Sequence, residues 1–510
     1  MTTDNGRQTT DKALWERLPA AINCRVGTAH QIALNRSWAK AGRDSNDKRS
    51  PNLKCQMTTD NGRQTTDKAA PFGPVVDLLI TGGLVLTLND RDEIFSEGAV
   101  AVTGDRIVAV RNASELLGTV QPRKLLDARG CLIMPGLINL HTHAAMTCFR
   151  GLADDLPLET WLHEHIFPAE AKHVSEDNVY WGTLLAVAEM IRSGTTTFCD
   201  GYFCEDGAAR AVIAGGIRAV CAQGVIDFPA PGVPDPSKNL ETAEEFVRRW
   251  RGRSPRLMPS IFCHSPYTCS VETLRRGKAL CLEYRIPFQI HVAETSGEVE
   301  ESLRRHGCRP VEYLKNLELL DSATICHHAD WIDGHEIDLL ADSGAGVSHN
   351  PESNMKLASG VAPLPEMLGA GVRVGLGTDG CASNNNLDML REMDTAAKLH
   401  KVHRLDPTVM AAGTVVRMAT RGGAAALGMA DDLGSLAPGK KADLITIDLD
   451  QPHLTPLYEP CSHLVYAARG ADVRDAIIDG RVVMRNRELL TVDLERVMTE
   501  VRKIAKKIRP

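Results

Sequence analysis

The middle of this 510-residue chain, from about residue 136 to residue 432, alternates short apolar runs with amphipathic stretches. Apolar runs bounded by Gly, Asn or Asp predict strands, whereas apolar residues that recur every three or four positions predict helices. Eight strands separated by helices are typical of a (β/α)8 TIM barrel, whose chemistry lies at the carboxyl ends of the strands. The strand candidates are "GLINLH", "GTTTFCD", "IRAVCAQGVID", "LMPSIFCH", "PFQIHVAE", "SATICHH", "GAGVSHN" and "VRVGLGTD".

Two groups of short apolar runs flank this region, one at residues 75–135 and the other at residues 433–510. Their texture, as in "DLLITGGLVLTLND" and "KKADLITIDLD", predicts strands joined by tight turns. We expect the two groups to combine into one small composite β-sandwich domain, with the barrel at residues 136–432 inserted between its halves. A C-terminal helix follows the second half.

The first 13 residues recur word for word at residues 57–69, including the methionine. Residues 14–56, between the copies, carry eight Lys and Arg against three Asp and Glu and show no clear periodicity. Such a segment is unfit to build a core. We expect the working chain to begin near Met57, with residues 1–56 as a disordered extension and 57–74 as a linker. A targeting segment is the competing hypothesis, because the composition is basic and acid-poor.

Composition narrows the classes of partner. The chain is 43% hydrophobic and 24% charged, and its net charge is −7, so it can bury a large core and has no basic footprint for nucleic acid. No apolar run reaches membrane-spanning length. Fourteen cysteines without a C-x-x-C pair or a secretory signal indicate a reducing, cytoplasmic setting, with a Cys263–Cys269 disulfide as the alternative. A small-molecule partner is therefore expected.

His141 and His143 stand two residues apart at the end of the first predicted strand. In an extended chain such residues project from the same face, so both imidazoles point to one place. Six of the other seven strands also finish on His or Asp, which a random scatter of histidines would not produce. Histidine and carboxylate ligands gathered in this way predict a metal site. These residues are Asp200, His264, His291 with Glu294, His327 with His328, His349 and Asp379.

Five segments carry a resemblance to a known family. In order and spacing they resemble the amidohydrolase superfamily, in the 5-methylthioadenosine/S-adenosylhomocysteine deaminase family, over about residues 75–490. The segments are "PGLINLHTHAAMTCFRGLADDLPLETWL", "HSPYTCS", "QIHVAETSGEVE", "SHNPESNMKLASG" and "GTDGCASNNNLDML".

The resemblance implies a metal held by His141, His143, His291 and Asp379. A divalent ion bound in this way keeps a position for water and lowers the pKa of that water, which supplies a nucleophile. Some relatives bridge two metals with a modified lysine on the fourth strand, but "RLMPSIFCHSP" has no lysine. We therefore expect one ion, zinc in the first place and Fe²⁺ as the alternative.

The resemblance also implies catalytic roles. Glu294 carries protons and would protonate the ring nitrogen beside the attacked carbon, and Asp379 both ligates the metal and accepts the water proton. The glycines of "GTDG" would let the backbone turn beside the ion. Relatives have one histidine before a small residue on the sixth strand, whereas this chain has His327 and His328. Adjacent strand residues face opposite sides, so the register predicts that His327 alone orients the water.

Two substrate contacts follow from the same resemblance. Glu170 matches a glutamate that binds the two ribose hydroxyls, and a carboxylate can accept from both. His264 matches a residue that lines the substrate pocket. After the third strand, Gln223 and prolines stand where some members have arginines, which leaves a homocysteine carboxylate without a candidate partner.

We therefore expect a metal-dependent deaminase of adenosine-type nucleosides: methylthioadenosine, S-adenosylhomocysteine, and also adenosine or 5′-deoxyadenosine. A triazine hydrolase is the enzyme alternative, and Glu170 discriminates because a triazine has no ribose diol. A non-catalytic scaffold would not need to keep the ligands or Glu294. The expected partner is the nucleoside, with neither nucleic acid nor membrane, and a homo-oligomer is expected because relatives form them.

Overall fold

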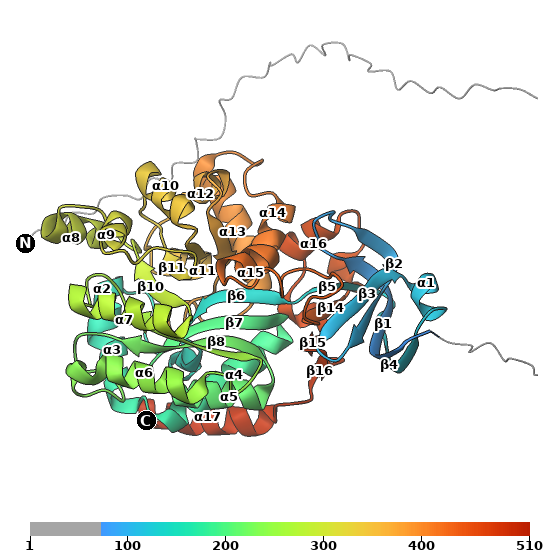
Figure 1. The fold of residues 1–510 in the computed structure, drawn as a ribbon, viewed down its shortest axis with the longest axis horizontal. Helices are drawn as coiled ribbons and strands as arrows, with labels where there is room; N and C mark the ends of the chain where they lie inside the picture. Colours follow the sequence, from blue (N-terminus) through green and yellow to red (C-terminus); the bar gives the residue numbers. More distant parts are fainter. Residues whose placement is uncertain (1–72, 510) are drawn as a thin grey trace, which may run out of the picture. The chain divides into compact units, whose positions relative to one another are not determined.

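The computed structural model describes residues 73–509 (Figure 1). The extension and linker predicted for residues 1–74 lie outside the described residues, apart from residues 73 and 74. Residues 73–509 form two β-sheets. One of them forms the barrel, and the other is a mixed sheet of parallel and antiparallel strands.

Within residues 73–509, the barrel consists of eight parallel strands in sequential order. All eight strand predictions, and with them the predicted barrel, are confirmed. The backbone N–H groups of Thr378 and Asp379 donate to the carbonyl of His141, which joins the last strand segment to the first at the carboxyl edge. The strands are β6 (Leu137–Thr142), β7 (Thr195–Tyr202), β8 (Arg218–Val225), β9 (Leu257–Cys263), β10 (Phe288–Val292), β11 (Thr324–His328), β12 (Gly346–His349) and β13 (Arg373–Leu376).

The barrel strands are buried on both faces, because helices cover the outside and side chains fill the inside. All eight residues of β7 are buried, and so are all eight of β8. Phe198 on β7 and Phe288 on β10 are among the largest fully buried side chains. This burial explains why the strands look like continuous apolar runs in the sequence rather than alternating ones.

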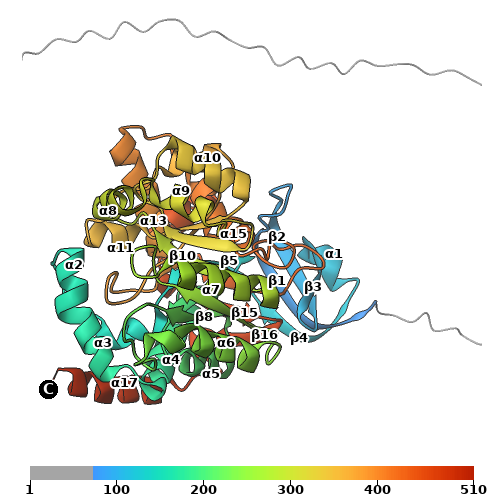
Figure 2. The same cartoon turned by 60° about the vertical axis from the view of Figure 1, so that its left-hand side comes forward.

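The helices surround the barrel, and Figure 2 shows the C-terminal helix α17 running beside α4. Ser175, Ser270, Thr295 and Asp333 each cap a helix N-terminus through a side-chain oxygen, which satisfies an otherwise unpaired backbone N–H. The α-helices are α1 (Ala113–Leu117), α2 (Leu158–Thr160), α3 (Phe167–His173), α4 (Glu176–Arg192), α5 (Glu205–Gly215), α6 (Asn239–Trp250), α7 (Val271–Tyr284), α8 (Ser296–His306), α9 (Pro310–Asn316), α10 (Gly334–Ser343), α11 (Pro351–Lys356), α12 (Leu364–Gly369), α13 (Met389–Arg404), α14 (Ala412–Arg417), α15 (Gly423–Ala426), α16 (Pro460–Tyr466) and α17 (Leu494–Ile508). Shorter or wider helical turns occur at η1 (Ala144–Phe149), η2 (Trp161–Ile166), η3 (Pro236–Lys238), η4 (Met418–Gly422), η5 (Pro452–Leu454) and η6 (Gly470–Asp472).

The second sheet combines strands from both ends of the chain, as predicted. It is one continuous mixed sheet, in which antiparallel pairing of β5 with β14 joins the two halves. Its strands lie within the predicted segments 75–135 and 433–510, while the domain boundaries themselves stay a prediction. The strands are β1 (Val75–Leu86), β2 (Ile94–Thr103), β3 (Arg106–Asn112), β4 (Gln121–Asp127), β5 (Cys131–Pro135), β14 (Leu444–Asp448), β15 (Val473–Ile478), β16 (Arg481–Arg485) and β17 (Glu488–Leu489).

A buried ion-pair network connects this sheet to the barrel. Arg218, the first residue of β8, lies with its Nε 2.7 Å from Oδ2 of Asp443 and its Nη2 3.1 Å from Oδ1 of Asp479. Because Arg218 begins a barrel strand, the sheet contacts the barrel at the amino ends of the strands. The carboxyl ends are left free for chemistry.

None of the helices in residues 73–509 combines the length and apolar character that a membrane span needs. Every cysteine in the described part of the chain, including Cys263 and Cys269, is a free thiol.

Candidate active site

The first barrel strand brings His141 and His143 to the carboxyl edge, with ring centroids 4.8 Å apart in an edge-on arrangement. Nδ1 of His143 donates a hydrogen bond to the carbonyl oxygen of Gly201 at the end of β7. Because a carbonyl only accepts, this bond places the ring proton on Nδ1 and leaves the lone pair of Nε2 available to a metal.

Four side chains from three strand ends converge at this edge. Nε2 of His291 lies 3.2 Å from Nε2 of His141, and Oδ1 of Asp379 lies 3.4 Å from Nε2 of both His141 and His143. Burial lowers the pKa of His141 to about 3, so its imidazole is neutral. Neutral nitrogen lone pairs crowded against a carboxylate fit a divalent metal ion, which favours this nitrogen and oxygen donor set.

Among the described residues, two overlapping groups have ligand atoms within 4.8 Å of one another. His141 with His143 and Asp379 forms one group, and His141 with His291 and His328 forms the other. The four residues predicted as ligands are therefore brought together, and His328 lies next to them.

Serine hydroxyls orient Asp379. Its Oδ2 accepts hydrogen bonds from Oγ of Ser353 at 2.7 Å and from Oγ of Ser383 at 3.0 Å, which turns Oδ1 towards the histidines. The backbone of Asp379 itself is left-handed, with φ of 59°, a conformation that is strained for a residue with a side chain.

The glycines flanking Asp379 have a different role from the predicted one. Neither has positive φ; a Cβ on Gly377 would lie 2.4 Å from Oδ1 of Asn350, and one on Gly380 would lie 2.6 Å from the sulfur of Met146. Close packing beside Asp379 favours glycine at these two positions, and Asp379 itself makes the turn.

Glu294 follows β10 through a tight turn that begins at Ala293, where φ is 51°. The Glu298 carboxylate accepts the backbone N–H groups of both Ala293 and Glu294 at 2.9 Å, so the first turn of α8 holds this loop in place. Burial raises the pKa of Glu294, which favours its protonated form closer to neutral pH.

The structure places His328 in the cavity and His327 beneath it, which corrects the prediction from strand register. The His327 ring stacks on the His141 ring with centroids 3.9 Å apart, and its Nε2 lies 3.2 Å from Oε1 of Gln289. His328 has φ of 74°, so the chain leaves the extended conformation at this residue. The two side chains therefore do not alternate between opposite faces of the strand. Both rings lie near the His141 ring, with centroids 3.9 Å and 5.6 Å from it.

Nε2 of His328 lies 3.9 Å from Oε2 of Glu294. Burial alone lowers the pKa of His328, but the carboxylates of Glu294, Asp379 and Asp330 raise it to about 9. On the other side of the ring, Asn354 and Asp330 form a buried polar string. His328 is thus held between Glu294 and this string.

The predicted substrate residues line the same cavity. The hydroxyl of Tyr202 donates to Oε1 of Glu170 at 2.6 Å, and burial raises the pKa of Glu170 to about 7. Nδ1 of His264 lies 3.0 Å from Oγ1 of Thr268, and burial lowers the pKa of His264 to about 3, so this imidazole is neutral.

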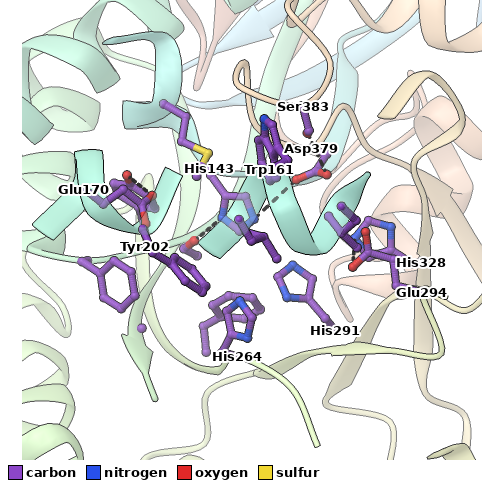
Figure 3. Close-up of a pocket in the computed structure, with 18 of the residues that line it drawn as sticks. His143, Trp161, Glu170, Tyr202, His264, His291, Glu294, His328, Asp379 and Ser383 are labelled. Carbon is purple, nitrogen blue, oxygen red and sulfur yellow. Dashed lines mark hydrogen bonds and ion pairs between the residues drawn. The ribbon is translucent and has the colours of Figure 1, made fainter. Parts of the chain in front are cut away.

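A cavity opens over these residues, and its empty space, open solvent included, is about 700 Å³. Figure 3 shows Glu170 with Tyr202 on one side, Glu294 with His328 on the other, and His143 and His291 between them. Its lining residues are His143, Met146, Leu158, Trp161, Leu162, Phe167, Glu170, Gly201, Tyr202, Phe203, Gly224, Val225, Phe262, His264, Tyr267, His291, Glu294, His328, Leu357, Asp379 and Ser383.

Comparison with known proteins identifies the family. The sequence model of the amidohydrolase family matches residues 132–483, which cover the barrel and the strands β5, β14 and β15 of the mixed sheet. The chain belongs to the amidohydrolase family.

The chain matches curated relatives over nearly the whole length of each relative. The 5-methylthioadenosine/S-adenosylhomocysteine deaminase of Syntrophobacter fumaroxidans is 53% identical over 434 residues, covering 85% of this chain and 99% of the relative. The corresponding deaminase 1 of Syntrophus aciditrophicus is 49% identical over 434 residues, covering 85% and 98%. The resemblance found in the sequence motifs is therefore confirmed.

Solved structures of other proteins share the fold. An adenosine deaminase from Xanthomonas campestris with bound zinc has a TM-score of 0.84 and 38% identity, covering 86% of this chain and 99% of the other. Atrazine chlorohydrolase from Arthrobacter aurescens, complexed with zinc, has a TM-score of 0.77 and 22% identity, covering 84% and 100%. The second likeness concerns the fold alone. Together with the convergent donor set, family membership indicates that this amidohydrolase binds a divalent metal.

Sequence reasoning assigned no role of their own in the chemistry to three residues of this amidohydrolase site. His328 precedes Ala329, so the pattern of one histidine before a small residue could have identified it. Tyr202 and Asn354 gave no comparable signal, because their partners lie 32 and 26 residues away along the chain. Only folding brings these pairs together.

Proposed function

We propose that this amidohydrolase is a metal-dependent deaminase of adenosine-type nucleosides such as methylthioadenosine, S-adenosylhomocysteine, adenosine and 5′-deoxyadenosine. It would replace the 6-amino group with oxygen and release ammonia. One observation carries the proposal: a single cavity holds Glu170 away from the metal ligands, with Glu294 beside them. A nucleoside has the same division, with a diol on its sugar and the reacting carbon on its base.

His141, His143, His291 and Asp379 would hold the ion. When bound, a divalent cation acidifies water at its open position and so supplies the nucleophile at neutral pH. We assign zinc, with Fe²⁺ as second choice, because three imidazoles and one carboxylate suit zinc and the adenosine deaminase of similar fold binds it.

Glu294 would protonate N1 of the purine as oxygen adds to C6, and burial, which raises the pKa of this carboxyl, favours the acid form that the step needs. This proton prevents negative charge from accumulating on the ring. Asp379 would accept a proton from water through Oδ1, since its Oδ2 is engaged by two serines. The C6–N6 bond then breaks, and the two water protons end on N1 of the product and on the departing ammonia.

His328 takes the place that the register prediction gave to His327. Its Nε2 faces Glu294 and the ligand cluster, where it would orient the attacking water. Glu170 would bind the 2′ and 3′ hydroxyls, with Tyr202 holding one carboxylate oxygen in position. His264 would form the neutral wall beside the sugar, as expected from the sequence.

The test measures the loss of adenine absorbance with methylthioadenosine and adenosine, and the change in the triazine's own ultraviolet absorbance with a chlorotriazine. The protein used has a measured metal content. Nucleoside turnover that falls at least 1,000-fold in Glu294→Gln, with metal content retained, is the expected result; general acid catalysis supplies roughly 10²- to 10⁴-fold. If metal-loaded protein turns over none of the nucleosides, the proposal is wrong. Turnover of the triazine alone would favour the alternative, in which Glu170 has no diol to bind.

The free thiols of the described cysteines support the expected reducing, cytoplasmic setting. A homo-oligomer stays a prediction, which light scattering on the purified chain would test.

A further inference from the structure

The cavity continues outward into a wider groove, and six residues line both spaces. We call them the collar. They are Leu158, Leu162, Phe167, His264, Tyr267 and Leu357.

The collar carries no charged side chain and is mostly apolar. Rings of Phe167, His264 and Tyr267 form a continuous edge-to-face series, with centroids 6.4 Å and 6.3 Å apart. Leucine side chains from η2, α2 and the end of α11 supply the rest. Among the described residues, no lysine, arginine or carboxylate belongs to the collar.

The outer groove gives no free cation to an anionic group that passes the collar. In the described part of the chain its lining includes one lysine and one arginine. Nζ of Lys356 lies 2.5 Å from Oδ1 of Asp154, and Arg305 pairs with Glu301. The groove also contains carboxylates, so its charge balance is acidic. These are Asp155, Glu159, Asp227, Glu298 and Glu301.

Stereochemistry places the 5′ group at the collar. In a nucleoside bound with C6 at the proposed metal ligands and its diol at Glu170, the base and the diol edge of the sugar each face one end of the cavity. C5′ is attached to C4′ and points away from the diol edge of the sugar. The collar is where the cavity opens, and it therefore takes what C5′ carries.

We propose that the collar is the 5′ subsite and that it selects uncharged, apolar 5′ groups. The inference rests on the proposed function and narrows its substrates. A methylthio group fills the collar and loses little hydration, and burying each methylene-sized unit improves binding about fourfold. A phosphate, or the carboxylate of a homocysteine tail, reaches an apolar neck and an acidic groove without a free partner.

The first test compares kcat/KM of the wild-type, metal-loaded enzyme for methylthioadenosine, 5′-deoxyadenosine, adenosine, S-adenosylhomocysteine and AMP. We expect methylthioadenosine to exceed both S-adenosylhomocysteine and AMP by more than tenfold. A ratio within tenfold for either charged compound overturns the inference while leaving the deaminase function intact. Absence of turnover with all five compounds overturns the proposed function and this inference with it.

The second test supplies the missing charge. Leu162→Arg puts a guanidinium in the collar and should raise the ratio of S-adenosylhomocysteine to methylthioadenosine kcat/KM at least tenfold. The control is Leu303→Arg, which adds the same charge on α8 at a residue that is 46% exposed and lines neither space. An unchanged ratio in Leu162→Arg, or an equal rise in the control, contradicts the inference. Leu158→Arg is the second variant if circular dichroism shows that Leu162→Arg is not folded.

Discussion

Nδ1 of His328 donates a hydrogen bond to Oδ1 of Asn354 over 2.9 Å. The orientation of that amide is determined on its other side, because Nδ2 of Asn354 donates to Oδ1 of Asp330 over 2.7 Å. A competing amide, Nδ2 of Asn350, lies farther from the same ring nitrogen, at 3.4 Å. The string therefore places a proton on Nδ1 and directs Nε2 towards Glu294.

The two adjacent histidines should respond differently to substitution. We expect His328→Gln to lower kcat at least 100-fold, because its ring faces the reacting atoms. His327→Gln should instead destabilise the fold by about 1–3 kcal/mol, the cost of disturbing a buried hydrogen bond, and retain at least a tenth of kcat. Steady-state kinetics and thermal unfolding measure both. The reverse pattern would return the catalytic role to His327.

Asp330 should act as a positioning residue for His328. In Asp330→Ala the Asn354 amide is free to turn its N–H towards Nδ1, and we expect kcat to fall about tenfold with metal content unchanged. Asp330→Asn keeps an acceptor oxygen at the same place and should restore most of the rate. The pH profile of kcat should move only in the alanine variant. Equal losses in both variants would show that the carboxylate charge, rather than the hydrogen bond, is required.

Glu170 should control substrate binding through its ionisation. Burial raises its pKa to about 7, so the carboxylate that accepts from both ribose hydroxyls forms as the pH rises through 7. We expect kcat/KM to rise with pH through this range and then level off. Glu170→Gln should remove this rise of kcat/KM with pH, which we call the acid limb of the profile. It should also raise KM and affect kcat less. A limb that persists in Glu170→Gln belongs to another group.

Tyr202→Phe is the matched variant for this prediction. Its hydroxyl lowers the pKa of Glu170 by donating a hydrogen bond, so removing it should move the limb of kcat/KM to higher pH. An unmoved limb would mean that Tyr202 does not act on the ionisation of Glu170.

The same shift has a consequence for stability. An acid whose pKa is raised by folding binds its proton more tightly in the folded state, so stability falls as the pH rises from the unfolded pKa towards 7. Glu170→Gln should therefore be more stable than wild type at pH 8 by about 3 kcal/mol and no different at pH 4. Urea unfolding of metal-free protein at the two pH values measures this difference.

Metal removal should cost both activity and stability. Chelation leaves three imidazoles and a carboxylate crowded without a cation, and binding at 1,000 times Kd stabilises a folded protein by about 4 kcal/mol. We expect Tm to fall by several degrees and to recover with added Zn²⁺. The Glu294→Gln variant should show the same change in Tm while remaining inactive. An equal Tm with and without metal would contradict the assigned ligand set.

Much of the site could be predicted from local pattern. His141, His143, His291 and Asp379 each stand at the end of an apolar run, and parallel barrel strands bring such ends to one edge. The choice between two adjacent residues at a strand end could not be made in this way. His328 and Asp379 both have positive φ, which breaks the alternation on which register arguments depend.

The sequence by itself determined the barrel, the two-ended mixed sheet and the polar strand ends among which the proposed metal ligands lie, because strand periodicity and residue type are local properties of the chain. Only the tertiary structure decided which of His327 and His328 enters the cavity, that Tyr202 holds Glu170, and that apolar side chains from separate segments meet in the collar. These relationships either join residues that are distant in sequence or depend on one backbone angle. Tertiary packing determines the distant contacts and that angle, and local sequence pattern carries no record of them.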